Sequence, residues 1–147
     1  MDPKEFLTGY LNDFSDLVKP DEDVVQKLTE VTDLLKIIHS KENKALIFGN
    51  GGSAAIASHF SVDLTKNAGL RCVNFNEADL ITCFANDYGF ERWVEKAVDF
   101  YGDEGDLLIV ISSSGSSENM LNGIKAARNG KFKAVVTFSG FEEDNPL

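Results

Sequence analysis

Hydrophobic residues recur at helical spacing near the start of the chain and form short continuous runs afterwards. In residues 4–18 and again in 24–38, leucine, valine and aromatic residues stand three or four positions apart, which predicts two amphipathic helices. Pro20 separates the two segments, and Asp21 is a candidate N-cap for the second helix. The chain is therefore expected to begin with a pair of helices.

Four short apolar runs follow, each typical of a strand that is buried on both faces. They are residues 45–48, 72–75, 107–111 and 134–138. Helical patterns intervene near residues 53–67, 78–86, 90–101 and 117–129. Strands that alternate with helices predict an α/β fold with a parallel sheet flanked by helices. We expect one domain over residues 1–147, with the helical pair in 1–41 and the α/β core in 44–147.

The segment after the fourth apolar run is an acidic loop, residues 141–147. With nothing beyond it, the fourth strand would lie at an apolar sheet edge that no helix covers. Another subunit could protect that edge, but we favour a different interpretation. We expect that a last strand and helix are missing and that the natural protein is longer.

Charge and cysteine content narrow the classes of partner. The net charge is −10, from 24 acidic and 14 basic residues, so neither nucleic acid nor an anionic membrane is an expected partner. No apolar run is long enough for a membrane helix, and the first residues do not resemble a secretory signal. Cys72 and Cys83 lack metal-type spacing and are expected to be buried free thiols, which favours a reducing, cytoplasmic setting.

A glycine-rich turn, Gly49-Asn50-Gly51-Gly52-Ser53, follows the first predicted strand and opens a helix. This arrangement presents free backbone N–H groups to an anion. The turn lacks the Lys-Ser/Thr pair of a Walker A loop and matches the dinucleotide fingerprint poorly, so no nucleotide cofactor is expected. A nucleotide-binding Rossmann protein stays a weaker alternative. Taken alone, the turn could equally be a tight corner with Ser53 as N-cap.

A second loop, Ser112-Ser113-Ser114-Gly115-Ser116-Ser117-Glu118-Asn119, follows the third predicted strand and also leads into a helix. Its five hydroxyls exceed what an N-cap needs, and hydroxyls with helix-start N–H groups suit the oxygens of a phosphate monoester. Open α/β sheets bind ligands at the carboxyl ends of their strands. The two loops together therefore favour a site for a phosphorylated sugar over a flexible surface loop.

The helix after the first loop carries two reactive side chains. Ile56, Phe60 and Leu64 recur at every fourth position and are the predicted core row. His59 and Asp63 lie four residues apart on the adjacent row, within reach of a shared proton or metal ion. Two ligands do not complete a zinc site, and such a pair alone is more typical of a simple hydrogen bond.

In order and spacing, GNGGSAAIASHFSVDL, CFANDYGF and VISSSGSSEN resemble the sugar isomerase (SIS) domain family. They are most similar to its bacterial phosphoheptose isomerase branch. The resemblance implies a flavodoxin-like sheet and a cytoplasmic homo-oligomer, either a tetramer or a dimer. It also implies aldose–ketose isomerisation through an enediol, which converts sedoheptulose 7-phosphate to a heptose 7-phosphate for lipopolysaccharide or capsule synthesis.

The same resemblance implies roles for individual residues. Contacts to the sugar phosphate fall on the first loop and on one later acid: Asn50, Gly51, Gly52, Ser53 and Asp87. Phosphate contacts fall on Ser112, Ser113, Ser114 and Ser117. His59 is implied as a zinc ligand, and Asp63 as both catalytic acid/base and zinc ligand.

Three departures from the family pattern bear on activity. Asp63 stands where the isomerases have a glutamate, which is one methylene longer, and Asn67 stands where they have a basic residue. The family also supplies a glutamine and a second catalytic histidine from a C-terminal helix, which would lie beyond Leu147. The alternative function is therefore a non-catalytic SIS protein that binds a sugar phosphate or a protein partner, as the replication-initiator-associating member does.

Overall fold

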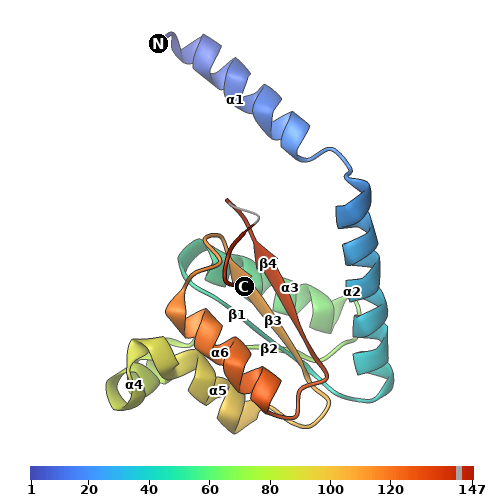
Figure 1. Cartoon of the computed structure of the whole chain (residues 1–147), viewed down its shortest axis with the longest axis vertical. Helices are drawn as coiled ribbons and strands as arrows, with labels where there is room; N and C mark the ends of the chain where they lie inside the picture. The colour runs from blue at the N-terminus through green and yellow to red at the C-terminus, as the bar shows by residue number, and fades with distance from the viewer. Residues whose placement is uncertain (142–143) are drawn as a thin grey trace. The chain divides into compact units, whose positions relative to one another are not determined.

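The computed structural model describes residues 1–141 and 144–147, in two compact units, Met1–Leu34 and Leu35–Leu147 (Figure 1). The first unit holds α1 (Pro3–Leu17) and most of α2 (Glu22–Ser40). Asp21 accepts a hydrogen bond from the backbone N–H of Val24 at 3.0 Å, which confirms it as the cap of α2. In the single chain no residue of α1 is buried.

The second unit is a four-stranded parallel sheet with helices between its strands (Figure 1). The strands are β1 (Ala45–Gly49), β2 (Cys72–Asn74), β3 (Leu107–Ser112) and β4 (Ala134–Ser139), in the order β2-β1-β3-β4. The connecting elements are α3 (Gly51–Lys66), α4 (Ala78–Tyr88), the 3-10 turn η1 (Phe90–Arg92), α5 (Trp93–Tyr101) and α6 (Glu118–Asn129). The order is flavodoxin-like, and the predicted α/β fold is confirmed.

Different helices pack against the two faces of the central strands. Leu46 and Phe48 of β1 pack with Leu108 and Val110 of β3 in the core beneath α5 and α6. Ala45 and Ile47 alternate with them and are fully buried, and α3 packs against β1 and β2. Because both faces are covered, β1 and β3 are continuous apolar runs, as their sequences indicated.

The predicted core row of α3, Ile56, Phe60 and Leu64, is right at Leu64 and wrong at Ile56, while Phe60 is half-buried. Ile56 is 60% exposed, and the buried residues of the helix are Ala57, Ser61 and Leu64. The physical reason is the closeness of the helix to the sheet: a Cβ atom added at Gly49 would lie 2.5 Å from the Ser53 carbonyl group. At that separation only small side chains fit beneath the first turns of α3, so the large Ile56 lies on the outer side.

The prediction that both cysteines are buried is also wrong. Cys83 is exposed on α4, where its thiol lies 3.8 Å from the Asp87 carboxylate, and Cys72 is half-buried. The described residues of α4 include no buried one, because this helix covers only the margin of the core. Both thiols are free, and burial raises the pKa of Cys72 to about 12, so that thiol is unreactive.

One buried residue, Asp106, ties the starts of three strands together. Asp106, whose side chain is 1% exposed, accepts hydrogen bonds from the backbone N–H groups of Lys44 (3.0 Å) and Asp103 (2.9 Å). The Lys44 ammonium lies 2.5 Å from the carboxylates of both Asp106 and Asp103. The Asp106 carbonyl accepts from the Lys133 N–H at 2.8 Å, just before β4. The entries to β1, β3 and β4 are thereby fixed to one another.

The same cluster sets the charge of Lys44. Burial alone would lower the pKa of Lys44, but the hydrogen bonds to Asp103 and Asp106 outweigh it and raise that pKa above its ordinary value. Because the pKa of Lys44 is higher in the folded than in the unfolded chain, its protonation stabilises the fold. This stabilisation is fully present at any pH below the ordinary lysine pKa. This contribution is lost only as the pH rises through the raised value, so Lys44 stabilises the fold across the neutral range.

Replacing Asp106 is therefore expected to destabilise the whole sheet. Asp106→Asn removes the buried partner of Lys44 and places an amide among N–H donors, which should cost about 3–5 kcal/mol in the free energy of unfolding. Urea denaturation measures that cost. Asp103→Asn is the matched control, because Asp103 also pairs with Lys44 but its own side chain is 80% exposed. Its free energy of unfolding should fall much less. Equal losses would refute the role given to Asp106.

Candidate active site

The two loops singled out in the sequence lie side by side at one edge of the sheet. β1 and β3 are adjacent and parallel, with Ile47 opposite Ile109 and Gly49 opposite Ile111, so the loops that follow them emerge together (Figure 1). A reciprocal pair of hydrogen bonds joins the loops: Asn50 Nδ2 donates to Asn119 Oδ1, and Asn119 Nδ2 donates to Asn50 Oδ1, both at 2.9 Å. The predicted convergence of the loops is confirmed.

Helix α3 begins without a side-chain cap. Its N-cap residue is Asn50, in the extended conformation usual for that position, yet the Asn50 side chain makes no cap hydrogen bond. The suggestion that Ser53 is the N-cap is wrong, because Ser53 already lies in the first turn of the helix. The Asn50 amide is engaged by Asn119 instead, so the first N–H groups of α3 have no side-chain partner from their cap residue.

Helix α6 repeats this arrangement. Its N-cap is Ser117, another cap-type residue without a side-chain cap hydrogen bond. Its hydroxyl accepts instead from the Ser112 hydroxyl at 3.3 Å, across the serine loop. Two helices of 16 and 12 residues therefore point uncapped N-termini at the same edge of the sheet. Uncapped helix N-termini carry partial positive charge and favour anions.

Hydrogen bonds between residues two or three positions apart shape the serine loop into a turn. The Gly115 N–H donates to the Ser112 carbonyl at 3.1 Å, and the Ser114 hydroxyl accepts from the backbone N–H of Ser116 at 3.3 Å. Ser112 is buried, whereas Ser113 and Ser114 are exposed. The loop thus has a fixed base and hydroxyls open to solvent.

Glycine is required at position 115 for two reasons. Its φ of +64° is disfavoured for residues with a side chain, and a Cβ atom there would lie 2.1 Å from Oδ1 of Asn145. Asn145 also donates from Nδ2 to the Ser139 hydroxyl at 3.0 Å, and Leu147 packs against the core beneath α5 and α6. Asn145 therefore lies against one side of the serine loop.

The reactive pair on α3 has the expected spacing. His59 Nε2 lies 3.6 Å from Asp63 Oδ2, with side chains 81% and 49% exposed. The other oxygen, Asp63 Oδ1, accepts from Asn67 Nδ2 at 3.1 Å. Each carboxylate oxygen thus has its own neighbour on the same helix face. The row is open to solvent, which suits side chains that meet a ligand.

The roles of all the site residues toward a ligand stay predictions, and this includes Asp87 and the zinc ligands. Asp87 is exposed near the end of α4, and its contacts are local, to Asn86 and Cys83, so its role toward a sugar stays a prediction. Among residues 1–141 and 144–147, no group of three or more His, Cys, Asp or Glu side chains is placed to hold a metal ion. His59 and Asp63 supply two ligands, whereas zinc requires three or four, so the described residues do not fit zinc by themselves.

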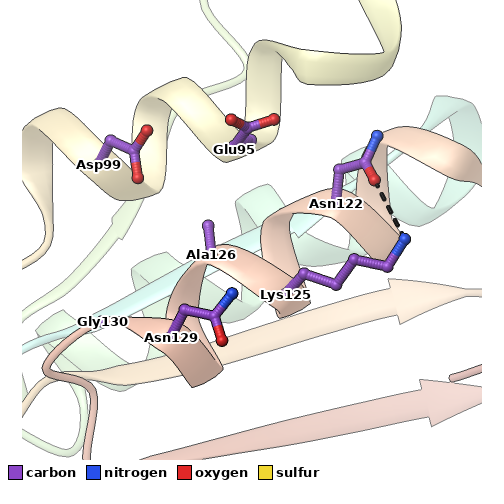
Figure 2. A pocket seen from close by; sticks show the side chains of 7 residues that line it. All are labelled: Glu95, Asp99, Asn122, Lys125, Ala126, Asn129 and Gly130. Atoms are coloured by element: carbon purple, nitrogen blue, oxygen red, sulfur yellow. Dashed lines mark hydrogen bonds between the residues drawn. The ribbon is translucent and has the colours of Figure 1, made fainter.

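A polar hollow of about 370 Å³ lies elsewhere, between α5 and α6 (Figure 2). Figure 2 shows Glu95 and Asp99 of α5 across from Asn122, Lys125 and Asn129 of α6. Hydrogen bonds from the Arg92 guanidinium are the main cause that lowers the pKa of Glu95. The hollow contains no predicted site residue. We therefore place the candidate site at the strand ends.

Comparison with known proteins identifies the family. Residues 9–139 match the sequence model of the SIS domain. This chain belongs to the SIS domain family. The resemblance seen in the sequence motifs is thereby confirmed. In the part of the SIS domain that the structure describes, no helix has the length and apolar character needed to cross a membrane.

Relatives of this SIS domain are phosphoheptose isomerases. The phosphoheptose isomerase of Fusobacterium nucleatum subsp. nucleatum is 40% identical over 138 residues, which are 89% of this chain and 70% of that protein. The solved phosphoheptose isomerase of Neisseria gonorrhoeae is 28% identical, with a TM-score of 0.81 over 95% of this chain and 76% of that one. The solved phosphoheptose isomerase of Francisella tularensis, at 24% identity, shares the fold, with a TM-score of 0.85 over 99% and 80% of the two chains.

Asn119 ends the VISSSGSSEN motif, but the sequence analysis assigned it no role in the site. It is 3% exposed, and its partner Asn50 lies 69 residues earlier in the chain. An asparagine in the first turn of a helix is common, and its sequence neighbours do not show that a second loop will meet it. Only the register of β1 with β3 brings the two amides together.

The close contact between Gly49 and α3 gives a direct test of the site's scaffold. Gly49→Ala places a methyl group 2.5 Å from the Ser53 carbonyl, so the helix must shift, at a cost of about 1–3 kcal/mol in the free energy of unfolding. Gly52→Ala is the control, because a Cβ atom there meets nothing within 4 Å. Chemical denaturation should show a loss for the first variant only. Unchanged stability of Gly49→Ala would contradict the close approach.

Proposed function

We propose that this chain is an isomerase of the phosphoheptose type, which interconverts sedoheptulose 7-phosphate and a heptose 7-phosphate. One observation carries the proposal beyond family membership: both helices at the strand ends begin with a cap-type residue whose side chain is engaged elsewhere. The amide groups left at these N-termini, with the open serine hydroxyls, suit the oxygens of a phosphate monoester. The relatives named above favour the hypothesis of an enzyme over that of a non-catalytic binding protein.

In this proposal the loops anchor the phosphate and α3 supplies the chemistry. Aldose–ketose isomerisation moves a proton between adjacent carbons through an enediol, which requires a positioned acid/base. Asp63 fills that role, with one oxygen held by Asn67 and the other next to His59. Anchoring the phosphate converts proton transfer into a step within one complex, so the position of Asp63 relative to the loops governs the rate.

Finer parts of the proposal go beyond the described residues. We include a zinc ion with His59 and Asp63 among its ligands; the ion would supply Lewis-acid chemistry. Its further ligands must then come from outside the described residues of a single chain. A cytoplasmic location and a role in surface-polysaccharide synthesis are further parts of the proposal. Both rest on the family resemblance of the sequence motifs.

Asp63 is the residue on which turnover should depend most strongly. Asp63→Asn keeps the shape and the Asn67 contact but removes the base, so kcat for sedoheptulose 7-phosphate should fall by about 10²–10⁴, with KM changed little. A coupled assay on the protein as its complete gene encodes it measures both constants. Asp79→Asn, which makes the same change in the first turn of α4, is the control and should leave kcat unchanged. Unaltered turnover by Asp63→Asn would remove Asp63 from the mechanism.

We also propose that the chain associates with copies of itself through α1, as a tetramer or dimer. Its apolar residues are all more than half exposed in the single chain, including Phe6 (54%), Leu11 (61%) and Phe14 (53%). A helix with such a face is stable in water when another apolar surface covers it. A second copy presents the same face, which suits a symmetric contact.

Charges placed on this face should separate the copies. Phe6→Glu combined with Phe14→Glu puts two carboxylates in the apolar stripe, and sedimentation velocity should then show monomers where the unaltered chain sediments as an oligomer. Asn12→Glu, on the opposite side of the helix, adds charge without touching the stripe and should preserve the oligomer. A monomeric unaltered chain at micromolar concentration would contradict the proposal.

A further inference from the structure

The reciprocal amide pair between Asn50 and Asn119 is the most specific contact at the candidate site. Two 2.9 Å hydrogen bonds join side chains 69 residues apart, and Asn119 is almost completely buried. A planar pair of this kind saturates one donor and one acceptor on each amide at once. It also fixes the distance and the relative rotation of the two loops, because neither amide can turn without breaking both bonds.

The pair has a consequence for the start of α3. The backbone of Asn50 already has the N-cap conformation, with φ −109° and ψ 145°. In that conformation an unengaged asparagine turns its Oδ1 onto an N–H group of the first helical turn. Here Oδ1 accepts from Asn119 instead. The N–H groups that a capping asparagine would take therefore stay open.

We propose that Asn119 is a positioning residue: by pairing with Asn50, it keeps the N-terminus of α3 uncapped for the phosphate of the ligand. This inference rests on the proposed function, since it requires a phosphorylated ligand at these loops. Asn119 acts through Asn50 and not by direct contact. Without Asn119, the Asn50 side chain caps its own helix and competes with the phosphate for the same N–H groups.

Asn119→Leu removes the amide and keeps a similar volume. It should raise the Kd for sedoheptulose 7-phosphate on the order of tenfold, because the ligand must then displace an N-cap. Isothermal titration calorimetry measures the Kd on the protein as its complete gene encodes it. Asn129→Leu, the same change at the other end of α6, is the control and should leave the Kd unchanged.

A second readout does not depend on the ligand. In Asn119→Leu the amide protons of Gly52 and Ser53 should exchange with solvent more slowly than in the unaltered protein, because Asn50 now accepts from one of them. A variant that merely loosens the loop would make the same protons exchange faster. The direction of this change separates a positioning role from a general structural one.

Asn119→Asp provides a pH-dependent version of the same test. A protonated carboxyl group can form both bonds with the Asn50 amide, whereas a carboxylate can only accept. Relative to the unaltered protein at each pH, this variant should bind sedoheptulose 7-phosphate normally in acid and progressively more weakly as the pH rises. This variant also guards against misfolding of Asn119→Leu, since it retains the buried polar pair at low pH.

A double-mutant cycle with Asn50→Ala completes the test. If Asn119 acts through Asn50, then Asn119→Leu should add almost nothing to the Kd once Asn50 is already alanine. The inference about Asn119 would fail if the effects of the two changes on the Kd were fully additive. It would also fail if Asn119→Leu left the Kd unchanged while the unaltered protein bound normally. Neither result would overturn the proposed function. Absence of any binding of sedoheptulose 7-phosphate by the unaltered protein would overturn the proposed function as well.

Discussion

The parallel pairing of β1 with β3 is the constraint on which the rest of the molecule depends. It places the ends of both strands at one edge of the sheet, so that a glycine-rich loop and a serine-rich loop emerge as neighbours. At the opposite edge, Asp106 holds the entries to β1, β3 and β4 with backbone and ammonium hydrogen bonds. A slip of one residue between the strands would separate Asn50 from Asn119 and break up the candidate site.

The site is built mainly from neutral groups, which explains how a chain of net charge −10 can be suited to an anion. Helix-start amides and hydroxyls create a local positive potential without lysine or arginine. Because these groups are neutral, removing water from them when the ligand binds costs less than desolvating a charged side chain. The acid/base chemistry comes from the exposed row His59, Asp63 and Asn67 on α3. Because α3 also carries one of the open N-termini, a single helix links phosphate anchoring to proton transfer.

Hydrophobic patterning predicted the fold well, because strands buried on both faces and amphipathic helices leave distinct periods in a sequence. The motifs also placed both loops correctly. What patterning could not give was the depth of packing between elements: the contact of Gly49 with Ser53 puts Ala57 and Ser61 inward and Ile56 outward. It also could not predict the pairing of Asn119 with Asn50, since an amide pair between distant residues depends on strand register and not on local sequence.

We propose that the two strand-end loops form one site for a phosphorylated sugar. Amide chemical shifts of the ¹⁵N-labelled protein, followed during titration with sedoheptulose 7-phosphate, test it most directly. If both loops bind the sugar phosphate, the shifts should be saturable and concentrated in residues 50–53 and 112–119, with one dissociation constant for both segments. Shifts confined to one loop, or centred on the hollow between α5 and α6, would contradict the proposal.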